Sequence, residues 1–195
     1  MDKSLLSDIL RAARNNQLAV TDEGILVPGA NVLLSGEYYH CVNGGPVAVD
    51  KNLLTVQGLA YLLNVGLHTT SKISAWYLAL FGGAATPLTT WTAATFPAGA
   101  SELSSGTEGY SEVNRPLWNG TTTTTGQIDN LTGGEATFTI VTAGTLSVTG
   151  AALLSDQGKG STSGVLMSAS KFSVARTLFN GDTFDLGYRV SITST

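Results

Sequence analysis

Alternating apolar and polar positions along most of the chain predict β-strands. Every second residue from Phe184 to Ile192 is apolar, and the residues between them are polar or glycine, which is typical of a half-buried strand. Residues 135–143 alternate in the same way. Further strands are predicted in residues 32–42, 46–52, 74–83, 144–156, 165–173 and 175–179, with a strong turn signal at 43–45 (NGG). The clearest hairpin turn is predicted at 180–182 (NGD). About eight strands separated by turns predict a mainly β fold, an antiparallel β-sandwich.

One internal segment has helical rather than strand periodicity. In residues 53–68, the apolar residues at helical spacing are Val56, Leu59, Ala60, Leu63 and Leu67. We expect Thr55 to cap the N-terminus of this helix and the apolar stripe to lie against a sheet. Gly58 weakens a helix by about 1 kcal/mol relative to alanine, unless a neighbour packs closely against it.

The first residues of the chain predict a second, separate helix. Residues 4–14 place Leu5, Leu6, Ile9 and Leu10 on one apolar stripe, and the segment 21–31 (TDEGILVPGAN) is typical of a linker. The chain is therefore divided into an N-terminal helix and linker arm, residues 1–30, and a β-sandwich domain, residues 31–195. The helix either covers the core of its own chain or, as we favour, reaches a neighbouring subunit, because a helix this short is marginal alone in water.

Two further segments are candidates for contact with partners. Residues 84–108 form a long loop rich in Ala, Thr, Pro, Gly and Ser, and such loops often contact other molecules. It contributes Trp91 and Phe96 as candidate interface residues. The stretch 109–120 (GYSEVNRPLWNG) contributes Arg115 and Trp118.

Glu112 and Arg115 in this stretch raise the question of chemistry. Pro116 favours extended backbone at Arg115, so the two side chains pair directly only across a bulge or turn. We expect Arg115 to donate hydrogen bonds to backbone carbonyls or to a neighbouring subunit. Tyr110, Leu117 and Trp118 are expected to anchor the segment to the core.

The charge content argues for contact with other protein chains and against several other functions. Charged residues are 12% of the chain against about 25% in average soluble domains, which fits buried subunit interfaces or a sandwich surfaced by Ser and Thr. The net charge is −4 and the ten basic residues are scattered, so nucleic-acid binding is not expected. A membrane span is not expected either, since no apolar run reaches about 20 residues. The N-terminus lacks the features of a secretory signal, which predicts synthesis in the cytoplasm.

Residues suited to catalysis or metal binding are few. The single cysteine, Cys41, is expected to be a buried thiol, and His40 and His68 are expected to be structural. The chain has no nucleophile elbow, phosphate-binding loop or zinc-ligand spacing. We therefore expect a protein that is not an enzyme and has no metal or cofactor.

Three segments, taken in order, resemble a family of tailed-bacteriophage virion proteins known as head decoration or cement proteins. They are NLLTVQGLAYLL, WYLALF and YSEVNRPLW, and the resemblance extends over roughly residues 32–193. It implies a structural protein on the capsid exterior that binds the major capsid protein, forms a homo-oligomer with three-fold order expected, and stabilises neighbouring capsid subunits. It implies no catalytic residues, and it does not extend to the N-terminal helix.

A tail or fibre-associated virion protein that binds host surface glycans is the alternative. It is based on Trp91, Trp118 and Tyr110, which lie in or near predicted loops beside polar residues. A role for these aromatic side chains in the core or at an interface is the simpler expectation.

Overall fold

A computed structural model of the chain describes residues 18–20, 26–28, 32–121 and 124–194. The chain divides into two compact units, Met1–Leu34 with Ser191–Thr195, and Ser35–Val190. In the first unit, β1 (Leu18–Val20) pairs antiparallel with β2 (Leu26–Pro28), which lies within the segment expected to be a linker. The helix expected in residues 4–14 lies outside the described residues.

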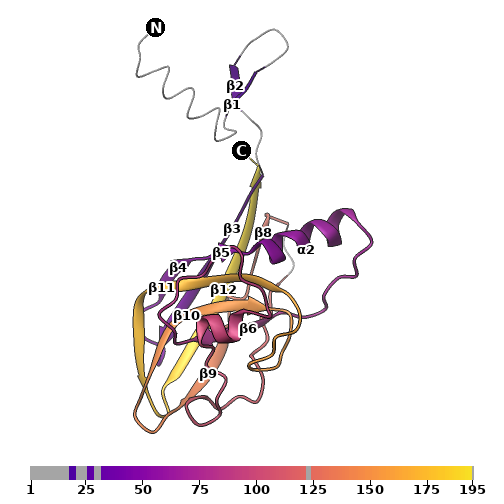
Figure 1. Cartoon of the computed structure of the whole chain (residues 1–195). Helices are drawn as coiled ribbons and strands as arrows, with labels where there is room; N and C mark the ends of the chain where they lie inside the picture. Colours follow the sequence, from indigo (N-terminus) through magenta and orange to yellow (C-terminus); the bar gives the residue numbers. More distant parts are fainter. Residues whose placement is uncertain (1–17, 21–25, 29–31, 122–123, 195) are drawn as a thin grey trace, which may run out of the picture. The chain divides into compact units, whose positions relative to one another are not determined.

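The described strands form two larger antiparallel sheets (Figure 1). The first has the order β5-β11-β10-β6, made of Leu53–Leu54, Leu166–Phe179, Thr145–Leu154 and Tyr77–Phe81. The second has the order β4-β3-β12-β9-β7, made of Ala48–Lys51, Val32–Val42, Thr183–Ser194, Ala136–Val141 and Gly109–Tyr110. A further short strand, β8 (Gln127–Asp129), pairs with β12. The predicted mainly β, antiparallel fold is confirmed, and the two sheets are arranged like a sandwich.

The alternation read from the sequence sets which side chains are buried between the sheets. In β12 the apolar residues Phe184 and Leu186 are buried, and in the paired strand β9 Phe138 and Ile140 are buried in the same core. The other sheet contributes Leu78, Leu80, Val148 and Leu153 to this shared core. The turn at 43–45 joins β3 to β4 as a hairpin, with Asn43 and Gly44 at positive φ, as its sequence predicts. The hairpin predicted at 180–182 is wrong, because this turn connects β11 to β12 and the two strands lie in different sheets.

Strand β6 is buried, although it lies at the edge of its sheet. It pairs with β10 on one side only, and its other edge is covered by irregular segments rather than by a strand. The backbone N–H of Leu78 donates to Pro116 O at 2.8 Å, and the N–H of Leu103 donates to Leu80 O at 2.9 Å. These bonds satisfy an edge that would otherwise be open to pairing with another chain.

Two helices complete the described structure, α2 (Val56–Leu67) and α3 (Phe96–Ala100). Thr55 caps α2 as predicted, since its Oγ1 accepts a hydrogen bond from the N–H of Gly58 at 3.0 Å. Neither helix is long and apolar enough to cross a membrane, a finding that applies to the described residues. Figure 1 shows α2 beside the strands, with its C-terminal end projecting away from them.

Candidate functional site

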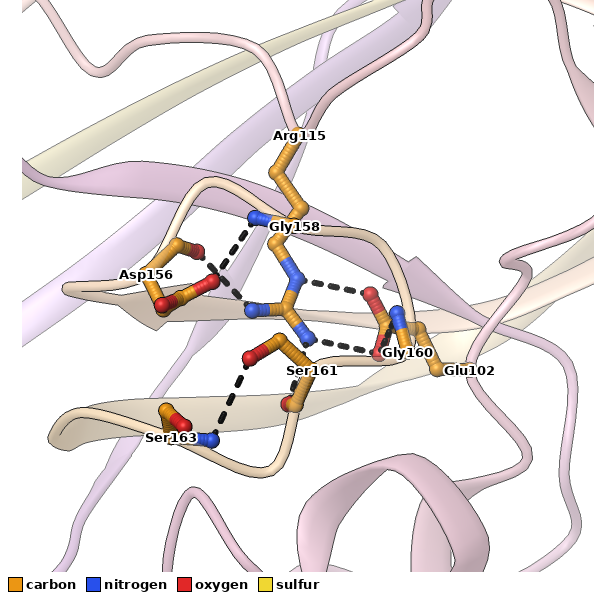
Figure 2. A network of polar contacts seen from close by, with 7 residues as sticks. All are labelled: Glu102, Arg115, Asp156, Gly158, Gly160, Ser161 and Ser163. Atoms are coloured by element: carbon orange, nitrogen blue, oxygen red, sulfur yellow. Dashed lines mark hydrogen bonds and ion pairs between the residues drawn. The ribbon is translucent and has the colours of Figure 1, made fainter.

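Arg115 is the centre of a buried polar network (Figure 2). Its Nε donates to Glu102 Oε1 at 2.7 Å and its Nη2 donates to Glu102 Oε2 at 2.8 Å, which is a two-pronged contact between guanidinium and carboxylate. Its Nη1 donates to Asp156 O at 2.9 Å, and Nη2 also donates to Ser161 O at 3.2 Å. The two charged side chains are 0% and 1% exposed. The expected hydrogen bonds to backbone carbonyls are confirmed.

This network holds together segments that are distant in the sequence. The N–H of Gly160 donates to Glu102 Oε2 at 3.1 Å, and the N–H of Arg115 donates to Gln157 O at 2.8 Å. Residues 158–164, a stretch rich in Gly and Ser, are thus tied to both Glu102 and Arg115. The charged side chains serve here to hold segments together, because the Arg115 guanidinium and the Glu102 carboxylate bind each other directly.

Glu112 lies apart from Arg115, as the extended backbone before Pro116 predicts. Both of its carboxylate oxygens accept a hydrogen bond from the N–H of Thr139 at 3.1 Å. Glu112 therefore fixes the segment to β9, while Arg115 fixes it to residues 156–161.

The three expected anchors of this segment have different outcomes. Tyr110 is fully buried, with Lys159 Nζ 4.1 Å above its ring. Trp118 packs against the core, and its Nε1 donates to Tyr188 O at 3.0 Å. Leu117 is 49% exposed, so its expected role as an anchor is wrong. Successive side chains of extended backbone point to opposite sides, and the inward position is taken by Trp118.

Trp91 and Phe96 lie in a second core on the other face of the four-stranded sheet. Their rings are 6.5 Å and 6.0 Å from the ring of Phe81, in edge-to-face contact, and 6.4 Å from each other. The long loop thus packs on this face of the sheet, and α3 forms part of that cover through Phe96 and Ala100. The interface role expected for Trp91 and Phe96 stays a prediction, while both side chains are packed within this chain. Trp91 and Tyr110 are also buried, so these two rings offer no open face on which a sugar could stack.

The remaining candidate interface residues are in two places. Leu5, Leu6, Ile9 and Leu10 lie outside the described residues. Trp118 lines an open cleft of about 650 Å³ between α2, residues 72–76 and β12. The cleft is lined mainly by apolar and aromatic side chains, with Tyr61 and Trp76 in edge-to-face contact at 5.5 Å and Lys72 among the few polar groups.

Helix α2 faces the opposite way from the sequence prediction. The face toward the protein consists of Gly58, Tyr61, Leu62 and Val65, of which Gly58 alone is fully buried. A Cβ at Gly58 would lie 2.5 Å from Met167 O, so a neighbour does pack closely against this glycine. The predicted core stripe is therefore exposed.

The exposed stripe of α2 is the main feature that sequence reasoning misplaced. Val56 is 60% exposed, Leu59 40%, Leu63 62% and Leu67 85%. The N–H of Val56 donates to Thr89 O at 2.9 Å, which places the neighbouring residue Leu88 near the start of the helix. Leu88 is also exposed. No charged side chain is on the helix. The signal was present in the sequence, because a helix that is apolar on both faces is normally covered on both faces.

The residues most open to a chemical role are His40, which is buried, and Cys41, which is only partly buried and not fully buried as expected. His40 is buried, its Nε2 lies 3.0 Å from Asp50 Oδ2, and its ring stacks on Phe172 at 3.9 Å. Burial lowers the pKa of His40 although the hydrogen bond with Asp50 opposes the shift, and the net effect favours the neutral ring. Burial, with the nearby Asp185 carboxylate, raises the pKa of the Cys41 thiol, which disfavours the reactive thiolate.

Cys41 and Asp185 line a second cleft, of about 500 Å³, on the six-stranded sheet. Thr137 Oγ1 donates to Asp185 Oδ1 at 2.6 Å, which occupies one carboxylate oxygen. Within the described ranges, His, Cys, Asp and Glu side chains form no group of three or more that is suited to a metal ion.

Comparison with known proteins adds no family to this picture. No protein-family model matches the sequence, and no characterised protein matches it at a significant level. The functional argument therefore depends on the residues and on the geometry described above.

Proposed function

We propose that this chain is a structural virion protein of a tailed bacteriophage, a decoration or cement protein on the capsid exterior. In this proposal a β-sandwich domain with an N-terminal helical arm binds the major capsid protein and stabilises neighbouring capsid subunits. The observation that carries the proposal is the exposed, uncharged apolar stripe of α2 on a protein poor in charge. Such a stripe is typical of a surface that is covered in an assembly.

The internal structure supports a role as a rigid clamp. Both faces of the four-stranded sheet are covered by apolar cores, and the Glu102–Arg115 pair fixes the loops at one end. A rigid subunit loses little conformational entropy when it binds, so modest contacts are sufficient. Repeated over a shell, they resist separation of adjacent capsid subunits through multivalency.

The candidate contact residues have specific places in this proposal. The arm residues Leu5, Leu6, Ile9 and Leu10 would dock on a capsid subunit or on a neighbouring copy. Trp118 lies at the apolar cleft, where a partner side chain can enter. The protein would be made in the host cytoplasm and would act as a homo-oligomer on the capsid exterior.

Co-sedimentation with virion parts tests this proposal. Purified protein is added to expanded capsids that lack it and, separately, to purified tails. We expect saturable binding to capsids at a fixed number of copies per capsid subunit and no binding to tails. Binding to tails alone, or to neither part, would overturn the proposal.

A further inference from the structure

Three Asn–Gly steps lie in the described part of the chain, and each is a candidate for spontaneous chemical modification. They are Asn43–Gly44, Asn119–Gly120 and Asn180–Gly181. In such a step the backbone nitrogen of the glycine can attack the side-chain amide of the asparagine, because glycine has no Cβ to hinder the approach and leaves the backbone flexible. All three asparagines are exposed and each follows a large apolar residue, so neither exposure nor local sequence distinguishes them.

At Asn43 the fold holds the reacting side chain. Its Oδ1 accepts hydrogen bonds from the N–H of Thr183 at 2.8 Å and from Thr183 Oγ1 at 3.3 Å, and its Nδ2 donates to Asp182 Oδ1 at 2.9 Å. These three bonds connect the turn at 43–45 to the turn at 180–182. Attack by the following backbone nitrogen requires the side-chain amide to rotate toward its own backbone, which would break them.

At Asn180 the fold holds both reacting groups. The Oδ1 of Asn180 accepts a hydrogen bond from the N–H of Thr142 at 3.2 Å. The nitrogen that would attack belongs to Gly181, and its N–H donates to Ile140 O at 2.9 Å. The attacking species is the deprotonated backbone amide, and a hydrogen-bonded N–H is harder to deprotonate. Both bonds must therefore open before the reaction can proceed.

Asn119 differs from the other two, because no described residue forms a hydrogen bond with its side-chain amide or with the N–H of Gly120. Both residues of this step are exposed. The residues on either side are held, since the N–H groups of Trp118 and Thr121 donate to backbone carbonyls at 2.8 Å and 3.2 Å. The step therefore lies between two fixed points, with its own reacting groups open to water.

We infer that Asn119 is a site of spontaneous deamidation in the folded protein, whereas Asn43 and Asn180 are protected. The nitrogen of Gly120 forms a bond to Cγ of Asn119, and ammonia leaves, which closes a succinimide ring. Water then adds to one of the two ring carbonyls and breaks the bond between that carbonyl and the ring nitrogen. The product is aspartate or isoaspartate, depending on the carbonyl that reacts. In both cases one water is consumed and one ammonia is released.

The modification would change the apolar cleft described above, because Asn119 and Gly120 both line it. A neutral amide would become a carboxylate in a cleft whose lining includes the cation of Lys72. Isoaspartate would also lengthen the backbone between the held N–H groups of Trp118 and Thr121. The inference goes beyond the proposed function and does not depend on it, since the reaction requires only the folded chain and water.

Peptide mapping by mass spectrometry measures the reaction at each step separately. The full chain is kept at mildly alkaline pH in water labelled with heavy oxygen, once folded and once unfolded in urea, so that conversion during later digestion carries no label. In urea the three asparagines should convert at similar rates, because the protecting hydrogen bonds are absent. In the folded chain Asn119 should convert at least about ten times faster than Asn43 or Asn180, because two or more hydrogen bonds must open at each of these.

Isoelectric focusing of incubated variants under native conditions gives a second readout. The wild type should gain an acidic band, and Asn119→Gln should not, since glutamine must close a larger ring and reacts far more slowly. Asn180→Gln is the matched control and should gain the same band as the wild type. Both side chains are exposed, so neither substitution should alter the fold, and thermal unfolding before incubation checks this.

Three results would overturn the inference. The first is conversion of Asn43 or Asn180 as fast as that of Asn119 in the folded chain. The second is an Asn119 that stays unconverted in the folded chain while the chain in urea converts. The third is an incubated Asn119→Gln that gains the same acidic band as the wild type. None of these results bears on capsid binding, which the co-sedimentation assay measures separately.

Discussion

Replacing Arg115 by alanine should destabilise the protein far more than an ordinary arginine substitution. The change leaves the Glu102 carboxylate, 1% exposed, without its pair inside the protein. Removing one partner of a buried ion pair costs about 3–5 kcal/mol in free energy of unfolding. The two hydrogen bonds to Asp156 O and Ser161 O are also lost, at about 1 kcal/mol each where no water replaces them. Together these losses should lower the free energy of unfolding by about 5–7 kcal/mol.

Urea unfolding followed by circular dichroism measures this loss, and the chain contains its own control. Arg189 and Asp129 form an ion pair at 3.0 Å, but their side chains are 31% and 25% exposed. Because water screens such pairs, Arg189→Ala should cost no more than about 1 kcal/mol. Arg115→Lys should behave like Arg115→Ala more than like the wild type, since an ammonium cannot reproduce the fork of bonds to Glu102.

A double variant separates the ion pair from the loss of packing. Glu102→Gln combined with Arg115→Ala removes the unpaired charge, so it should be more stable than Arg115→Ala alone. If Arg115→Ala costs no more than Arg189→Ala, the reasoning that Arg115 holds these loops together is refuted.

Two further predictions concern α2 and the buried histidine. Gly58→Ala should destabilise the protein, because the new Cβ would lie 2.5 Å from Met167 O. As a control, the new Cβ of Gly66→Ala in the same helix meets nothing within 4 Å, so this variant should be more stable than the wild type by about 0.5–1 kcal/mol. A stabilising Gly58→Ala in urea unfolding would contradict the close contact. Burial, together with the charge of Arg176, lowers the pKa of His40 below 6.5, so the unfolded chain takes up this proton first as the pH falls. Stability should therefore decline as the pH falls below about 6.5, and His40→Gln should reduce this slope between pH 7 and 5; equal urea-midpoint slopes in both proteins would be evidence against a neutral, buried ring.

Local rules predicted the elements of this fold well where one pattern allows one structure. Strict alternation placed a strand at residues 183–193, and the structure has β12 at Thr183–Ser194. The cap at Thr55 and the hairpin turn at 43–45 depend on residues that are close together in the sequence, so the local sequence is sufficient to predict them.

Prediction was less successful where the outcome depends on tertiary contacts. Helix α2 is apolar on two faces, so periodicity alone could not say which face is inward, and the close approach at Gly58 decided it. Trp91 and Phe96 lie in a stretch with the composition of a loop, and nothing local indicates that it covers a sheet. Arg115 was predicted to bind carbonyls, but Glu102, its main partner, lies thirteen residues away with no pattern that links the two.

A cryo-electron microscopy reconstruction of expanded capsids saturated with this protein tests the decoration proposal most directly. We expect ordered density on the outer surface that bridges adjacent capsid subunits, together with a higher temperature of capsid disruption than in undecorated capsids. An outer surface without added density, or decorated capsids that disrupt at the same temperature as undecorated ones, would contradict a stabilising role on the capsid.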